Sequence, residues 1–142
     1  ITHSMLNTVV VSINQGNRFD FVKFFAQRNV PQALRSLHQI FKSGKKDFDH
    51  CIPLTASLFQ HFQTLLITRE LFEEGQMSDQ IAKELNKHPF MFKKEDYVGQ
   101  SRLHSIEKLQ TILIRLSEID AQLKNGGITS ALQYEIELLQ IL

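Results

Sequence analysis

The sequence predicts an all-α protein. Apolar residues recur every three or four positions in several long segments, which is the spacing of an amphipathic helix. No segment of useful length alternates apolar and polar residues as a half-buried strand does, and no repeat of fixed period occurs. Hydrophobic residues make up 42% of the 142 residues, enough to build a core in one domain, or in one small domain plus part of another.

Composition excludes several classes of protein. The formal net charge of +1 gives the chain as a whole no strong attraction to nucleic acid or membrane. Cys51 is the only cysteine, so an internal disulfide is excluded and a cytoplasmic location is expected. No apolar run approaches the roughly 18 residues of a membrane span. The chain starts at Ile1 without a Met or a signal peptide, and we expect further residues before it in the full protein.

The first part of the chain is predicted to hold up to three helices. Thr2 is a good N-cap for the first, although residues 9–11, all Val, fit a short strand equally well. A second helix is predicted over Phe19–Asn29, and a third begins with Pro31 in its first turn and Asn29 as its cap. The apolar positions of the second and third helices are Phe21, Val22, Phe24, Phe25, Ala33, Leu34, Leu37, Ile40 and Phe41.

The best internal boundary is Lys45–Asp49, a polar and charged stretch that follows a stop at Gly44. Beyond it, Pro53 is predicted to open a helix that runs to about Glu74 and stops at Gly75. One side of that helix is lined by Leu54, Leu58, Phe62, Leu65, Leu66 and Phe72.

Two more helices are predicted at the end of the chain. Residues 97–100 either continue a preceding helix or break it near Gly99, and Ser101 is expected to cap the next helix. Gly126 and Gly127 end that helix, and Thr129 is expected to cap the last one. Their apolar positions are Leu103, Ile106, Leu109, Leu113, Leu116, Ile119 and Leu123, then Ala131, Leu132, Tyr134, Ile136, Leu138, Leu139 and Leu142.

No pattern of residues indicates catalysis, a cofactor or a metal. The six histidines (His3, His38, His50, His61, His88 and His104) never occur three or four positions apart, so zinc-ligand spacing is absent. Cys51 follows His50 directly, but adjacent side chains point apart on a helix, so Cys51 is interpreted as a buried or half-buried structural thiol. Asp120 and Lys124 are spaced for a favourable helix ion pair. We therefore predict no catalytic, cofactor-binding or metal-binding residues.

The stretch Met77–Lys94 has the outline of a helix-turn-helix. Ser78 caps a short helix, Asn86 suits a left-handed turn, and Pro89 opens a second helix. A DNA-reading helix offers polar side chains at its start, whereas this one begins with residues 89–92, Pro-Phe-Met-Phe. Phe90 is therefore predicted to be core, and a DNA-binding regulator is kept as the alternative function. Lys93 and Lys94 fit either phosphate contacts or a solvated face.

Residues of this same stretch carry a family resemblance. Leu85-Asn86-Lys87-His88-Pro89-Phe90, followed by two lysines, resembles the delta subunit of the bacterial DNA polymerase III clamp loader. Residues 17–21 followed by Gln32-Ala33-Leu34-Arg35-Ser36-Leu37, the helix over 54–73, the run Asp120–Gly126 and the Leu-rich end are similar to that family in the same order.

The resemblance implies two parts and an assembly role. Residues 1–46 would be the C-terminal part of an AAA+ lid domain, and residues 47–142 a helical collar domain through which loader subunits join. The implied partners are the gamma/tau and delta prime subunits, the sliding clamp through an amino-terminal module that precedes this chain, and primed DNA in the assembled complex. The resemblance implies no ATP hydrolysis by delta itself, within a complex that belongs to a DNA-directed DNA polymerase, a nucleotidyltransferase.

Overall fold

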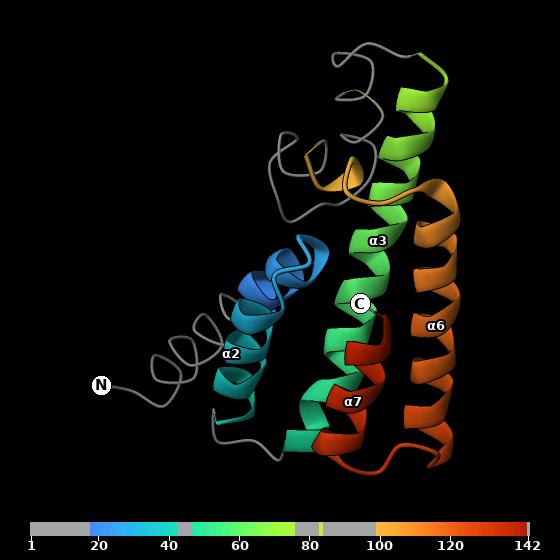
Figure 1. Cartoon of the computed structure of the whole chain (residues 1–142). Helices are drawn as coiled ribbons and strands as arrows, with labels where there is room; N and C mark the ends of the chain where they lie inside the picture. Colours follow the sequence, from blue (N-terminus) through green and yellow to red (C-terminus); the bar gives the residue numbers. More distant parts are fainter. Residues whose placement is uncertain (1–17, 43–46, 76–82, 84–98, 142) are drawn as a thin grey trace, which may run out of the picture.

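The computed structural model describes residues 18–42, 47–75, 83 and 99–141, and everything it describes is helix, turn or short connection (Figure 1). After a helix over residues 18–26 come α2 (Val30–Phe41), a 3₁₀ turn η1 (Asp47–His50), α3 (Cys51–Glu73), α6 (Ile106–Asn125) and α7 (Ala131–Ile141). The described ranges contain no strand, which confirms the predicted all-α class. Within these ranges no helix is both long and apolar enough to cross a membrane.

The first two described helices form a hairpin, residues 18–42. The helix over 18–26 ends three residues before the predicted Asn29, because Arg28 takes a left-handed conformation (φ 63°) that turns the chain. Asn29 then caps α2 as predicted, with its side-chain oxygen accepting from the Gln32 backbone N–H at 3.5 Å.

The long helix α3 begins two residues earlier than predicted. It starts at Cys51 directly after η1, and Pro53 is its third residue rather than its first. Proline is tolerated there because the first four N–H groups of a helix have no intrahelical acceptor. Gly75 follows the end of α3 with φ 77°, so the predicted glycine stop is confirmed.

The start of α6 differs from the prediction. Ser101 was expected to cap this helix, but it is buried in a short helical turn over residues 99–101. The chain leaves the helix at 102–104, where His104 reaches the carbonyl of Ala26, and α6 then begins after Ser105. The Ser105 hydroxyl caps it by accepting from the Lys108 N–H at 3.1 Å. Gly126, with φ 89°, ends it as predicted.

The cap of α7 lies one residue later than predicted. Ser130, rather than Thr129, accepts from the Gln133 backbone N–H at 3.2 Å. The Gln133 side chain in turn accepts from the Thr129 backbone N–H at 2.9 Å, so two backbone N–H groups at the start of α7 are bound by nearby side chains. A capping hydroxyl binds the backbone N–H three residues later in the chain, so, for the N–H of Gln133, Ser130 is better placed than Thr129.

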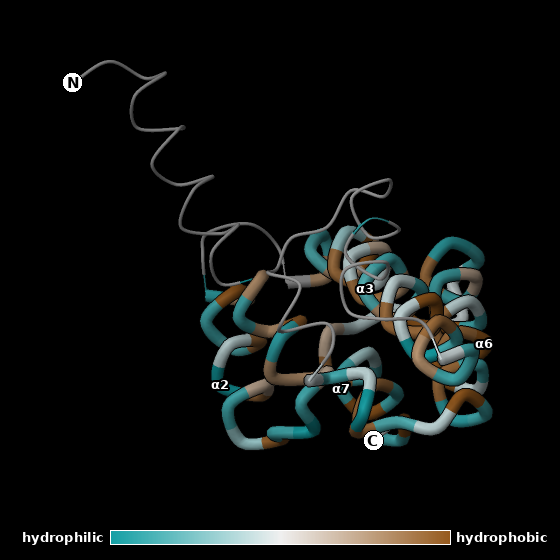
Figure 2. The backbone as a smooth tube through the Cα atoms, turned by 90° about the horizontal axis from the view of Figure 1, so that it is seen from above, coloured by the Kyte–Doolittle hydropathy of each residue, from teal (hydrophilic) through white to brown (hydrophobic). Residues whose placement is uncertain are grey.

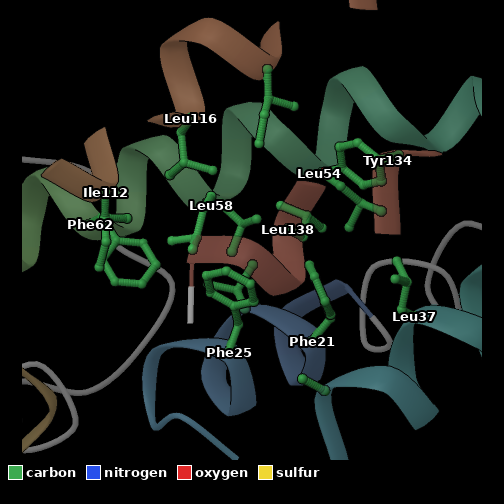
Figure 3. Packing of buried hydrophobic residues seen from close by; sticks show 14 of the residues in the cluster. Phe21, Phe25, Leu37, Leu54, Leu58, Phe62, Ile112, Leu116, Tyr134 and Leu138 are labelled. Atoms are coloured by element: carbon green, nitrogen blue, oxygen red, sulfur yellow. The ribbon is translucent and has the colours of Figure 1, made fainter. Parts of the chain in front are cut away.

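The described helices share one hydrophobic core built around α3. Phe21 and Phe25 of the first helix point toward Leu58 of α3 and Leu138 of α7 (Figure 3). α2, α6 and α7 surround α3, and Figure 2 places α7 between α2 and α6, across from α3. The core therefore continues across the predicted boundary at 46/47, and the division of the chain into lid and collar parts stays a prediction.

Candidate assembly surface

The residues considered above as candidates for catalysis or metal binding have structural roles wherever the structure describes them. Cys51 is fully buried at the start of α3, as predicted. No group of three or more His, Cys, Asp or Glu side chains in the described part of the chain is arranged to hold a metal ion. His3, His88 and all of Met77–Lys94 except Lys83 lie outside the described residues, so the helix-turn-helix outline and the burial of Phe90 stay predictions.

Three histidines make polar contacts in the described part of the chain, and two of them, His61 and His104, are buried. His104, almost fully buried, donates from Nε2 to the Ala26 carbonyl at 2.9 Å and ties the first helix to the start of α6. Burial lowers its pKa, and Arg28 and Lys108 nearby lower it further. Buried His61 pairs with the Gln100 side chain at 2.5 Å, and His38 pairs with Glu135 at 2.7 Å. Each of these three histidines therefore has at least one polar partner in the described part of the chain.

The feature that stands out is a ridge of apolar side chains on α7, formed by Leu132, Ile136 and Leu139. Their exposed fractions are 65%, 47% and 38%. Residues spaced by four and three positions lie along one helix face, so the three form a continuous stripe. The residues of α7 that enter the core are Tyr134, Leu138 and Ile141, which fall on the opposite face. α7 is thus apolar on two faces, and only one of them is covered by the described chain.

Polar contacts on both flanks hold α7 in place and keep the ridge pointing outward. On one side Glu135 pairs with His38 of α2. On the other side Glu137 accepts from Arg115 of α6 at 3.0 Å, and the Lys108 ammonium donates to the Ile141 carbonyl at 3.0 Å. Because α2 and α6 contact the two flanks of α7, the ridge is the face of α7 that remains available for contact with a partner.

A buried hydrogen-bond chain anchors α7 to α3. The Tyr134 hydroxyl lies 2.9 Å from the Thr55 hydroxyl, and Thr55 donates to the Cys51 carbonyl at 2.8 Å. Tyr134 is completely buried, which raises the pKa of its hydroxyl and keeps it neutral. A satisfied phenol in the core fixes the rotation of α7 about its axis, and with it the direction of the ridge.

A shallow groove lies between α3 and α6. Its cavity of about 320 Å³ is lined by Ile52, Ala56, Phe59 and Leu116, with Ser117 and Thr55 beside them. The Asp120–Lys124 pair, at 2.8 Å as predicted, also borders it. The volume is at the lower end of the range for small-molecule sites. Half of the lining residues are polar, which makes the groove a weaker candidate than the ridge.

The described residues form a helical bundle with an exposed apolar stripe on α7, and such a stripe is typical of a surface that contacts another protein. The family model described as "DNA polymerase III delta subunit, C-terminal domain" matches residues 15–141. The chain therefore belongs to this family, and the resemblance noted from the sequence is confirmed.

Two relatives agree with the family assignment. The DNA polymerase III subunit delta of Bacillus subtilis (strain 168) is 28% identical over all 142 residues, which span 39% of that protein. The solved structure of the Bacillus subtilis DNA clamp loader delta protein superposes with a TM-score of 0.71 at 27% identity, covering 90% of this chain and 36% of that one. The chain thus corresponds to less than two fifths of the length of these relatives.

Sequence reading did not single out the ridge. Leu132, Ile136 and Leu139 were counted with Tyr134 and Leu138 as one apolar set, because hydropathy does not distinguish a core face from a docking face. A signal was present in the sequence, because the six large apolar side chains among the eleven residues of α7 are more than one buried stripe needs.

Proposed function

We propose that this chain is the assembly part of a clamp-loader delta subunit. In this proposal residues 47–142 form the collar domain that joins delta to the gamma/tau and delta prime subunits, and residues 1–46 end the AAA+ lid. The proposal is supported by the family, by the similarity to the two delta relatives, and by the ridge on α7. The ridge carries the most weight, because an uncovered apolar stripe on a braced helix has a use only when a partner covers it.

The wider role follows from the relatives. Delta would act in the cytoplasm within the complex that loads the sliding clamp on primed DNA for DNA polymerase III. Contact with the clamp would come from the amino-terminal part that relatives have and this chain does not span. The proposed contribution of this chain is binding rather than bond-making, so it supplies subunit contacts to the polymerase complex and no catalytic group of its own.

The test is reconstitution of the full-length protein with the gamma/tau and delta prime subunits of its own organism. Ile136→Glu places a charge in the centre of the ridge, and desolvating it in an interface costs several kcal/mol. Ile114→Glu is the matched control, because Ile114 is 60% exposed on α6 and lies outside the ridge. Co-elution in gel filtration should be lost for Ile136→Glu and retained for Ile114→Glu.

Two results of this experiment distinguish an error in the proposed function from an error in the proposed interface. If the unaltered protein does not co-elute with any loader subunit, the proposed function is wrong. If it co-elutes and Ile136→Glu does so equally well, the function stands and the ridge is not the interface. Circular dichroism of both variants should match that of the unaltered chain, since exposed substitutions change stability by about 0.5 kcal/mol or less.

A further inference from the structure

The connection between α6 and α7 contains the one Asn-Gly pair of the sequence, Asn125-Gly126. In such a pair the backbone nitrogen of the glycine can attack the carboxamide carbon of the asparagine and displace ammonia. A glycine favours this reaction because it has no side chain to shield its nitrogen and because its backbone adopts many conformations. Whether the pair reacts in the folded chain depends on what surrounds the two residues.

The fold leaves both reacting groups accessible. Asn125 and Gly126 are exposed, and a Cβ atom placed on Gly126 would meet no heavy atom within 4 Å beyond its chain neighbours. The Gly127 backbone N–H donates to the Asn125 Oδ1 at 2.9 Å, which folds the side chain back over the following peptide units and polarises its carbonyl toward attack. The Gly75 N–H at the end of α3 donates to the Phe72 carbonyl, whereas no carbonyl in the described part of the chain accepts from the Gly126 N–H.

Asn29 is the other asparagine that the structure describes, and its surroundings oppose the same reaction. It is half-buried, and the next residue, Val30, has a β-branched side chain beside the nitrogen that would attack. The Asn29 side-chain oxygen accepts from the Gln32 backbone N–H and so takes part in the cap of α2. Asn29 is therefore an internal reference that should remain unmodified.

The residues that follow the pair link it to the core and to the ridge. Gly126 turns the chain at the end of α6 through its positive φ of 89°. The Ile128 N–H then donates to the Gln122 carbonyl at 3.1 Å, and the Ile128 side chain is buried in the core. Two residues later, Ser130 caps α7. A longer main chain at Asn125 would therefore displace Ile128 and the start of the helix that carries the ridge.

We propose that Asn125-Gly126 is a site of spontaneous deamidation, and that its isoaspartate product loosens the connection between α6 and α7. The Gly126 nitrogen loses its proton and bonds to the Asn125 Cγ, the Cγ–Nδ2 bond breaks, and the proton leaves with the amide nitrogen as ammonia. The product of this step is a cyclic succinimide.

Water opens the succinimide ring in one of two ways. Addition at Cγ breaks the new bond and gives aspartate. Addition at the main-chain carbonyl carbon of Asn125 gives isoaspartate, in which the main chain runs through Cβ and Cγ and is longer than before. Either product exchanges an amide for a carboxylate, which lies at the negative end of the α6 dipole. This modification is no part of the proposed assembly role, so the inference goes beyond that role.

The experiment is ageing of the folded 142-residue chain at physiological temperature in heavy-oxygen water, followed by digestion and tandem mass spectrometry. A protease that cleaves after glutamate releases residues 119–135, which contain the pair. Asn125 should become a carboxylate that carries one heavy oxygen, and Asn29 should stay an amide. An isoaspartyl methyltransferase should label the intact aged chain. The rate should rise in proportion to hydroxide concentration, because the attacking nitrogen has to lose its proton.

Hydrogen exchange of the purified isoaspartate form tests the effect on α7. The backbone amides of α7 should exchange several-fold faster than in the fresh chain, since local opening becomes easier. Asn125→Gln keeps the carboxamide but would need a larger ring, so this variant should keep the exchange of the fresh chain after ageing. Fresh Asn125→Asp adds the charge without lengthening the main chain, and should show only a small part of the increase.

Two results would overturn the proposal. If Asn125 stays an amide in the folded chain while it reacts in the denatured chain, the fold protects the pair and the proposed site is wrong. If isoaspartate forms and the α7 amides exchange at the rate of the fresh chain, the proposed effect on α7 is wrong. Neither measurement involves a loader subunit, so failure of this inference leaves the proposed assembly role to its own test.

Discussion

Replacing Phe25 with alanine tests whether the hairpin of residues 18–42 and the bundle that follows it are one cooperative unit. Phe25 is 2% exposed, and its ring lies 5.8 Å from that of Phe62 on α3 in an edge-to-face arrangement at 85°. A second ring, Phe21, is also 5.8 Å away. Truncating a buried phenylalanine removes its apolar burial and leaves a cavity, at a cost of about 3–5 kcal/mol in the free energy of unfolding. That loss corresponds to a melting temperature lower by roughly 6–20 °C.

The measurement is urea and thermal unfolding, followed both by helical circular dichroism and by tyrosine fluorescence. In a Tyr97→Phe background the tyrosine signal comes from Tyr134 alone and reports on α7, and the chain has no tryptophan to mask it. With one continuous core, both signals should shift together in a single transition. Phe24→Ala is the control, because this neighbouring ring is only partly buried and should cost less. If Phe25→Ala leaves the fluorescence transition in place, the core is not cooperative and residues 1–46 unfold as a separate domain.

Two further predictions concern polar groups in the core. Tyr134→Phe should lower the free energy of unfolding by about 1 kcal/mol in urea titrations, because one buried hydrogen bond is lost while Thr55 keeps its bond to the Cys51 carbonyl. An unchanged free energy of unfolding would mean that the Thr55–Tyr134 bond contributes nothing to stability. The pKa of His104 is lowered in the fold, so the unfolded chain binds more protons and stability should fall as pH drops through about 6.5, the ordinary pKa of His. His104→Gln should flatten this slope between pH 7.5 and 5 in urea midpoints, and an unchanged slope would refute the assignment to His104.

Helix type and order could be predicted from the sequence, because the apolar spacing and the punctuating residues are local signals. Asn29, Gly75 and Gly126 each act at the position that their conformational preferences predict. The start of α6 could not be predicted, because two serines were available and tertiary structure chose between them. His104 has to reach the carbonyl of Ala26, and that contact, 78 positions away, interrupts the helix after Ser101.

The central role of α3 was also hidden in the sequence. Sequence reading gave it one apolar side, yet Thr55, Thr64 and Thr68 are buried as well. Each of these hydroxyls donates to the carbonyl four residues earlier, at 2.8–3.0 Å, so no other helix has to supply a partner. A threonine whose hydroxyl donates to a carbonyl of its own helix can be buried in a core, but a hydropathy pattern does not identify it as a core residue.

The functional surfaces were the least predictable features. The ridge on α7 became visible only once Tyr134 and Leu138 were seen to face the core, which leaves Ile136 on the other side. The excess of Lys and Arg over Asp and Glu in residues 1–46 was concealed by summing charge over the whole chain, since the acidic residues of 47–142 offset it. Such surfaces consist of side chains that the folded chain leaves exposed, whereas the spacing of apolar residues mainly predicts which side chains are buried.

The shortness of α7 has a consequence for quality control of assembly. At eleven residues, this helix is below the length at which an isolated helix persists in water. Its helical form depends on Tyr134 in the core and on the flanking contacts of Glu135 and Glu137. Only a chain that has already folded therefore presents Leu132, Ile136 and Leu139 as a stripe. Under the proposed function, a misfolded or partly synthesised copy would lack the ridge and would therefore not bind the other subunits.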